Sequence, residues 1–206
     1  IKLDGNYPVG TENVALGNTA LDDASVGNYN VAIGDASLTA NTGSNNTAVG
    51  ASSMDANTSG GDNAAMGAAT LRANTTGSYN TALGRHALTS NTTSSANTAV
   101  GYQAGYASNS VYGGNAFFGY QSGLNSSTAY GSAFFGDSSG LSNTTGINNV
   151  AVGASALRSN TTASNNTAVG YQASISNTTG SENASFGRQA LGGNTTGSQN
   201  TALGRS

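Results

Sequence analysis

Few side chains in this sequence could support acid–base or metal chemistry. His86 is the single histidine, it follows Arg85, and the chain contains no cysteine. An isolated surface histidine is a simpler interpretation of this residue than a general base. Asp22, Asp23 and Asp35 form an acidic cluster, yet calcium takes about six to eight oxygen ligands, and the nonapeptide of calcium-binding β-rolls is missing. We therefore expect no enzymatic activity, no metal and no cofactor.

Aromatic side chains are concentrated between residues 102 and 135, and some of them could bind a saccharide. Three tyrosines follow a glycine and precede a glutamine, and a fourth lies nearby. These candidate binding residues are Tyr102, Gln103, Tyr106, Tyr120, Gln121, Tyr171 and Gln172. An exposed tyrosine ring can stack on a sugar while the neighbouring amide hydrogen-bonds to it. In the alternative interpretation, the pairs Phe117–Phe118 and Phe134–Phe135 fill a wider core and the tyrosines pack on neighbouring repeats.

Asparagine-linked glycosylation sequons recur along the chain. Candidate acceptors are Asn74, Asn91, Asn143, Asn160, Asn177 and Asn194. In a glycosylating secretory route these residues would carry sugar at the edge of a loop. The simpler interpretation is that Asn-Thr-Thr is the turn-forming segment of a repeat, and that the sequon recurs because the repeat does.

A single repeat positions all of these residues. The pattern Asn-x-Ala-apolar-Gly occurs twelve times, and its glycines, from Gly17 to Gly204, are spaced by 17 residues with one spacing of 16 and one of 18. Both exceptions fall in the polar half of the repeat, at residues 41–43 and 107–114. Surface loops tolerate such changes in length. We therefore expect each repeat to form one structural segment of fixed length and one loop.

The length and composition of the repeat favour β-structure. Seventeen residues are too few for a helical hairpin repeat, and Asn, Thr, Gly and Ser are poor helix formers. Short strands separated by Gly and Asn turns fit better. We predict an all-β parallel β-solenoid of about twelve 17-residue rungs, with residues 1–12 as a lead-in or capping segment and 13–206 as the repeat array. Stacking at about 4.8 Å per rung gives a rod roughly 55 Å long.

Each repeat position becomes a column of stacked side chains. The fourth position is always large and apolar, so we expect it to form the core. The first position is Asn in all repeats but that of Ser132, and a second Asn column lies seven residues after the glycine; both predict amide ladders. Strand alternation then points the third position, mostly alanine, outward. A flat alanine strip suits the close approach of another chain, so we expect an oligomer.

These anchors resemble the head repeats of trimeric autotransporter adhesins, the YadA-like left-handed parallel β-roll. The longer unit, NTAVGYQA followed by NTTGS and NTALG, resembles the repeats of phage tail-fibre and related virion proteins. The resemblance covers nearly all of residues 13–204, although the adhesin repeat is shorter and lacks this loop. It implies a trimer of β-rolls, displayed on a cell or virion, that spaces or presents a binding surface.

Charge and hydropathy exclude other classes of partner. The chain has 6 Lys or Arg, 9 Asp or Glu and a net charge of −3. The absence of a basic run argues against nucleic acid and polybasic membrane binding. No apolar stretch approaches the roughly 18–20 residues that span a bilayer, so we expect no membrane insertion. Because the sequence starts at Ile1 and stops within a repeat, we expect it to be a piece of a longer protein.

Three functional interpretations follow. The favoured one is a non-enzymatic extracellular, cell-surface or virion fibre segment that mediates adhesion or receptor (glycan) binding. Its partners would be other copies of itself, in a homotrimer or a filament, and a cell-surface glycan or receptor. The second is a structural filament or surface-layer element without a specific ligand. The third, an ice-binding solenoid, is less favoured because the threonine column at position two is interrupted by Val14, Val31, Ala64 and Val150.

Overall fold

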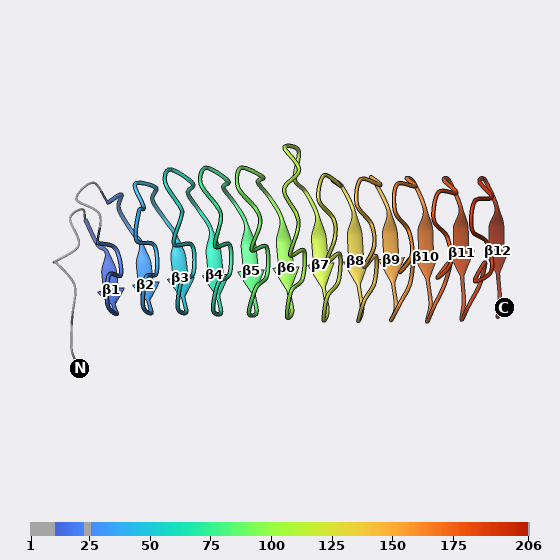
Figure 1. Ribbon diagram of the computed structural model, residues 1–206, viewed down its shortest axis with the longest axis horizontal. Coiled ribbons are helices and arrows are strands. Elements are labelled where there is room, and N and C mark those ends of the chain that lie inside the picture. The colour runs from blue at the N-terminus through green and yellow to red at the C-terminus, as the bar shows by residue number, and fades with distance from the viewer. Residues whose placement is uncertain (1–10, 23–25, 206) are drawn as a thin grey trace.

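The computed structural model describes residues 11–22 and 26–205, and these form an all-β parallel β-solenoid. It has about eleven turns and twelve strands, with no helix among the described residues. Each turn returns the chain to a strand beside the preceding one, so the order of strands in the single sheet is the order in the sequence. Figure 1 shows β1 and β12 at opposite ends of this row. The predicted lead-in, residues 1–12, lies almost wholly outside the described residues, as does Asp23.

Every strand is three residues long and coincides with positions two to four of a repeat. We count positions from the asparagine of each motif, or from Ser132 in the eighth, and number each rung after its strand. The strands are β1 (Val14–Leu16), β2 (Val31–Ile33), β3 (Thr47–Val49), β4 (Ala64–Met66), β5 (Thr81–Leu83), β6 (Thr98–Val100), β7 (Ala116–Phe118), β8 (Ala133–Phe135), β9 (Val150–Val152), β10 (Thr167–Val169), β11 (Ala184–Phe186) and β12 (Thr201–Leu203). The longer loop between β6 and β7 stands above its neighbours in Figure 1.

The strands face the opposite way from the predicted orientation. In the third position, Ala48 and Ala82 are fully buried. In the fourth position, Met66 is 55% exposed and Phe186 is 40% exposed. Neighbouring residues of a strand do point to opposite faces, as expected, but the prediction that the fourth position forms the core and the alanine strip faces outward is wrong. Alanine is buried because a large side chain from elsewhere in the rung fills the interior.

That large side chain comes from position nine. The residues of this column in the regular rungs are Leu21, Leu38, Met54, Leu71, Leu88 and Leu157, all buried. Their backbone is left-handed, with φ from 45° at Leu71 to 53° at Met54, a conformation that costs about 1–2 kcal/mol for an L-residue. Complete burial of a leucine or methionine stabilises by about 1.5–3 kcal/mol and offsets this strain.

Rungs 7 and 8 fill the same interior in the reverse manner. Phe117 and Phe134 replace the third-position alanine and are fully buried. Glycine replaces leucine at position nine, and a Cβ at Gly105 or Gly123 would overlap the ring of Phe117, while one at Gly140 would overlap that of Phe134. The expectation that phenylalanines fill the core is therefore confirmed for one member of each pair. The other members, Phe118 and Phe135, point outward.

Both predicted asparagine ladders are confirmed. In the position-one column, the Oδ1 of Asn80 accepts a hydrogen bond from the backbone N–H of Asn97 at 3.0 Å. In the position-twelve column, the Nδ2 of Asn74 donates to the Oδ1 of Asn57 at 2.6 Å. These buried amides satisfy one another and the backbone from rung to rung, as buried polar groups require. They hold the loop and the strand of each rung in register with the next.

The glycine at position five lets successive rungs approach closely at the corner after each strand. Gly84 has φ of 122°, and a Cβ there would lie 2.6 Å from the carbonyl oxygen of Gly101 in the next rung. Any other residue would be strained and would push the two rungs apart. The residues that follow this corner, at positions six and seven, are therefore held in fixed columns.

Candidate ligand-binding site

One side of the rod is an uncharged, largely apolar surface, which we call the strand face. It consists of the outward side chains at positions two and four of β1 to β12, and none of these residues is charged. On this face the rings of Phe118 and Phe135 stack in parallel, with centroids 4.8 Å apart and planes 6° apart. The structure therefore places large apolar side chains, instead of the predicted alanines, where another chain could approach.

The tyrosine–glutamine pairs of rungs 6 and 7 form two parallel columns beyond the glycine corner. The rings of Tyr102 and Tyr120 are stacked, with centroids 5.5 Å apart and planes 15° apart. The Nε2 of Gln121 donates a hydrogen bond to the Oε1 of Gln103 at 2.8 Å. Tyr102 remains 37% exposed and Tyr120 51% exposed. The tyrosines therefore pack on neighbouring rungs, as the structural interpretation expected, and still present ring surface to a ligand.

His86 joins these residues from rung 5. Its ring meets those of Tyr102 and Tyr106 edge-on, with centroids 6.3 and 6.2 Å away. The sequence predicted an isolated surface histidine, and this prediction is wrong. Positions seven and ten of consecutive rungs become neighbours because positions eight and nine turn into the core. We call the resulting group the tyrosine cluster. Its members are His86, Tyr102, Gln103, Tyr106, Tyr120 and Gln121.

The surroundings of His86 favour its neutral form over the charged one. Burial, followed by the positive charges of Arg85 and Arg72, lowers the pKa of His86 below its usual value near 6.5. Its Nδ1 is buried and has no hydrogen-bond partner. A neutral imidazole between two tyrosines offers a flat surface for stacking.

The described residues offer no metal-binding cluster and no membrane-spanning helix. Residues 11–22 and 26–205 contain no group of three or more His, Asp or Glu that could hold a metal ion. Over the same residues, no helix has the length and apolar character needed to cross a membrane.

The remaining predicted binding residues lie elsewhere on the rod. Tyr171 and Gln172 belong to rung 10, three rungs beyond Tyr120. Gln172 Oε1 accepts a hydrogen bond from Gln189 Nε2 at 3.0 Å, and the guanidinium of Arg188 lies 5.7 Å from the centroid of the Tyr171 ring. The fold therefore divides the predicted set into the tyrosine cluster and a smaller second group.

The candidate glycosylation sites lie in the position-twelve ladder. Asn74, Asn91, Asn143, Asn160 and Asn177 are fully buried, while Asn194 is half-buried. The Nδ2 atom that would carry the glycan already donates hydrogen bonds within the fold; that of Asn160, for example, donates to Asn143 Oδ1 at 2.7 Å. The folded ladder and a glycan on the same nitrogen exclude one another. Glycosylation at these residues thus stays a prediction for a chain modified before it folds.

Comparison with known proteins assigns no family to this chain. No family model, no curated protein and no solved structure matches it. The likeness to adhesin and tail-fibre repeats therefore remains a resemblance of repeat pattern. A functional proposal must rest mainly on the strand face and the tyrosine cluster.

Proposed function

We propose that this chain is a non-enzymatic segment of an extracellular, cell-surface or virion fibre that assembles as a homotrimer of left-handed β-rolls and mediates adhesion or receptor (glycan) binding. The observation that carries the proposal is the strand face, an uncharged and largely apolar stripe along the length of the array. Adhesion is supported by the exposed rings of the tyrosine cluster. The resemblance to trimeric adhesin heads supplies the number of chains and the handedness.

The apolar stripe supports self-association because it repeats with the rungs. A second copy with the same rung spacing can match it position by position, whereas a globular partner would meet only a few rungs. The stripe is roughly 55 Å long on the basis of rung spacing, and exposed apolar patches of such extent mark interaction sites in soluble proteins. Val14, Met66 and Phe186 are each at least 40% exposed, and burial of such a side chain contributes about 1.5–3 kcal/mol.

Sedimentation equilibrium at micromolar concentration tests the assembly. We expect the mass of three chains for the unaltered protein. The double substitution Met66→Lys and Leu83→Lys would bury two charges in the interface and should give monomers. As the matched control, Thr76→Lys and Thr93→Lys place the same charges on exposed loop residues and should leave the trimer intact. A monomeric unaltered protein would refute the trimer.

A structural filament or surface-layer element without a ligand is the second candidate. It is favoured by the contacts within the tyrosine cluster, because Tyr102 stacks on Tyr120 and Gln121 bonds to Gln103 without any bound molecule. Glycan-array and cell-binding assays of the double variant Tyr102→Ser and Tyr120→Ser separate the two functions. Loss of binding supports adhesion, and unchanged binding removes the tyrosine cluster as its site.

Ice binding is the weakest of the three candidates. The position-two threonines lie on the strand face, but Ala64 and Val150 occupy the same column. Large apolar residues fill the neighbouring position-four column, so hydroxyl groups form no regular two-dimensional array. Absence of thermal hysteresis in a solution of the protein would exclude this function.

A further inference from the structure

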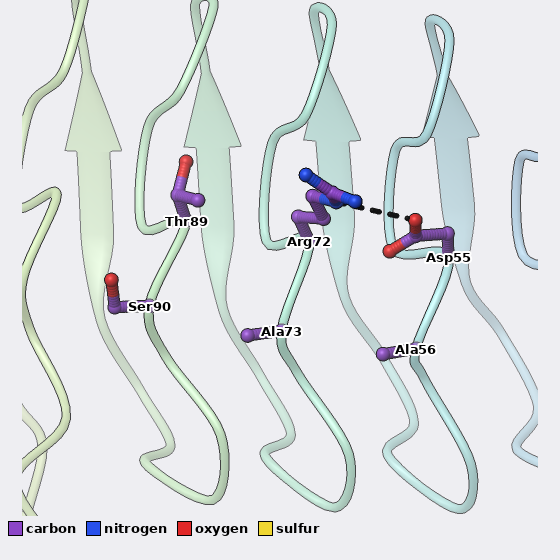
Figure 2. Close-up of a pocket in the computed structure, with 6 residues that line it drawn as sticks. All are labelled: Asp55, Ala56, Arg72, Ala73, Thr89 and Ser90. Carbon is purple, nitrogen blue, oxygen red and sulfur yellow. Dashed lines mark hydrogen bonds and ion pairs between the residues drawn. The ribbon is translucent and has the colours of Figure 1, made fainter.

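A groove lies beside the tyrosine cluster on rungs 3 to 5. Its volume is about 540 Å³, and its lining residues are Asp55, Ala56, Arg72, Ala73, Thr89 and Ser90. Figure 2 shows these six side chains on the coil segments of consecutive rungs, with Arg72 directed toward Asp55. The groove thus lies outside the strand face and shares no residue with it.

Two adjacent columns shape this groove. Position ten supplies the longer side chains Asp55, Arg72 and Thr89, and position eleven supplies the short ones, including Ala56 and Ala73. Backbone hydrogen bonds hold the columns together, because the N–H of Ala56 donates to the carbonyl of Arg72 at 3.2 Å and that of Ala73 to the carbonyl of Thr89 at 3.0 Å. The short side chains leave open space alongside a row of polar groups.

The groove continues into the tyrosine cluster. Tyr106 occupies position ten of the next rung, and the backbone N–H of Ser90 donates to its carbonyl oxygen at 3.0 Å. The Tyr106 ring contacts His86 at 6.2 Å between centroids. From Arg72 to Tyr106 is a step of two rungs, roughly 10 Å at the usual strand spacing. One ligand of a few sugar units can therefore reach both.

The charge of this region favours an anion. Arg72 is 58% exposed, and its Nε lies 3.3 Å from the Oδ2 of Asp55. An exposed ion pair of this kind contributes little, about 0–1 kcal/mol, so Arg72 can turn toward a ligand at small cost. Arg85 adds a second positive charge, since both arginines lower the pKa of His86. The planar guanidinium of arginine matches a carboxylate better than an ammonium group does.

We propose that the groove and the tyrosine cluster form one binding site for an acidic saccharide, in which Arg72 binds a carboxylate and Tyr106 stacks on a sugar ring. This inference rests on the proposed glycan-binding function and specifies its ligand class. Thr89 and Ser90 line the space between the two anchors. The Thr89 hydroxyl donates to the carbonyl oxygen of Ala69 at 3.0 Å, so its oxygen can accept a hydrogen bond from the sugar, and the Ser90 hydroxyl can do the same. Asp55 holds the arginine at the mouth of the groove when no ligand is bound.

The chain contains a matched control for the arginine. Arg158 also occupies position ten and is exposed, but the same position two rungs further on is Gly192, where Arg72 has Tyr106. Arg72→Gln and Arg158→Gln therefore remove the same charge from equivalent places on the rod. Only the first lies beside the tyrosine cluster.

Isothermal titration calorimetry with the full chain tests the proposal. The acidic probes are tetragalacturonate and 3′-sialyllactose, and the neutral probes are the methyl ester of tetragalacturonate and lactose. We expect at least one acidic probe to bind about tenfold more tightly than its neutral counterpart. Arg72→Gln should abolish this difference, Arg158→Gln should preserve it, and Tyr106→Ser should weaken both members of the pair.

The outcomes separate this inference from the proposed function. If acidic and neutral probes bind equally well and their binding depends on the tyrosines, the acidic-saccharide site is overturned and glycan binding stands. If Arg158→Gln removes the preference for the acidic probe as strongly as Arg72→Gln does, the preference comes from the net charge of the chain. This result also overturns the site. If neither acidic probe binds, the inference is wrong, and binding of neutral members of a glycan array then decides whether the broader function stands.

Discussion

Rungs 5 and 7 have the same backbone course but fill the interior with opposite pairs of side chains. Rung 5 combines a small residue in the strand, Ala82, with a large one at position nine, Leu88. Rung 7 combines the large Phe117 with Gly123. In these two rungs the two columns together fill the interior, and neither column does so alone. Between rungs 10 and 11 the same two columns meet through polar side chains. The hydroxyl of Ser174 at position nine lies 2.9 Å from that of Ser185 at position three.

The two regions also differ in their ladders. The position-twelve amides run continuously through rungs 2 to 5, but Ser108 and Ser126 replace asparagine in rungs 6 and 7. The Oγ atoms of both serines and the Oδ1 of Asn91 are buried without hydrogen-bond partners. Rung 7 thus combines a larger core residue, Phe117, with a broken ladder. The tyrosine cluster and the longest loop belong to the same segment of the rod.

The largest expected effect tests how the two columns fill the interior. Phe117→Ala leaves a cavity between Gly105 and Gly123, and we expect a loss of about 3–5 kcal/mol in the free energy of unfolding. Phe118→Ala, one residue along and pointing outward, should cost less in the isolated chain. Urea denaturation of both variants measures the difference. Equal costs would mean that the ring of Phe117 does not fill the interior.

A second substitution sharpens the same comparison. Gly123→Leu alone should destabilise by about 1–3 kcal/mol, because the new side chain overlaps the ring of Phe117. Combined with Phe117→Ala, it restores the alanine–leucine pair of the regular rungs and should recover stability. The double-mutant cycle should therefore show strong non-additivity. Simple addition of the two losses would contradict coupling between the columns.

A smaller effect is expected from the position-one ladder. Asn80→Ala removes the acceptor of the Asn97 backbone N–H and leaves that buried donor unpaired, which costs about 1–3 kcal/mol. Asn80→Ser should cost less, because the natural Ser132 accepts from the Asn149 N–H at 3.2 Å in the same way. Thermal unfolding of both variants checks the order. A serine variant as unstable as the alanine variant would show that the Nδ2 donor of Asn80 matters more than its Oδ1 acceptor.

The sequence predicted the repeat geometry well and the orientation of the strands poorly. Regular glycine spacing indicates the rung, and two asparagine columns indicate ladders, since each feature depends on one column at a time. Orientation depends on two columns, because positions three and four are both apolar and alternation alone does not say which is inside. The deciding signal is that Phe117 and Phe134 coincide with glycine at position nine, where most other rungs have leucine or methionine.

The candidate site was predictable to the same extent. Tyr102 and Tyr120 share a column, so their spacing in the sequence already places them together. His86 and the Arg72 groove were missed, because they join the tyrosines through contacts between different columns. Such contacts follow from the inward turn at positions eight and nine, which the sequence pattern alone did not reveal.

The smallest expected effect repairs the broken ladder. The backbone at Ser108 keeps the regular course, since its N–H donates to Gly105 at 2.9 Å just as that of Asn91 donates to Leu88 at 3.1 Å. Ser108→Asn should therefore bring an Nδ2 donor to the unpaired Oδ1 of Asn91 and stabilise the chain by about 0.5–1.5 kcal/mol. Differential scanning calorimetry should show a rise of a few degrees in Tm.

The control places the same residue one column away. Ser159→Asn introduces an asparagine at position eleven, where Asn125 occurs naturally. It should change Tm little, because its amide is not directed at an unpaired acceptor such as Asn91 Oδ1. If Ser108→Asn lowers Tm, the space around Asn91 is too small for a second amide. Rungs 6 and 7 would then lack the ladder because the core around Phe117 leaves no room for it. A rise in Tm would show instead that the asparagine ladder is compatible with the aromatic core. The broken ladder would then be a separate feature of the longest loop.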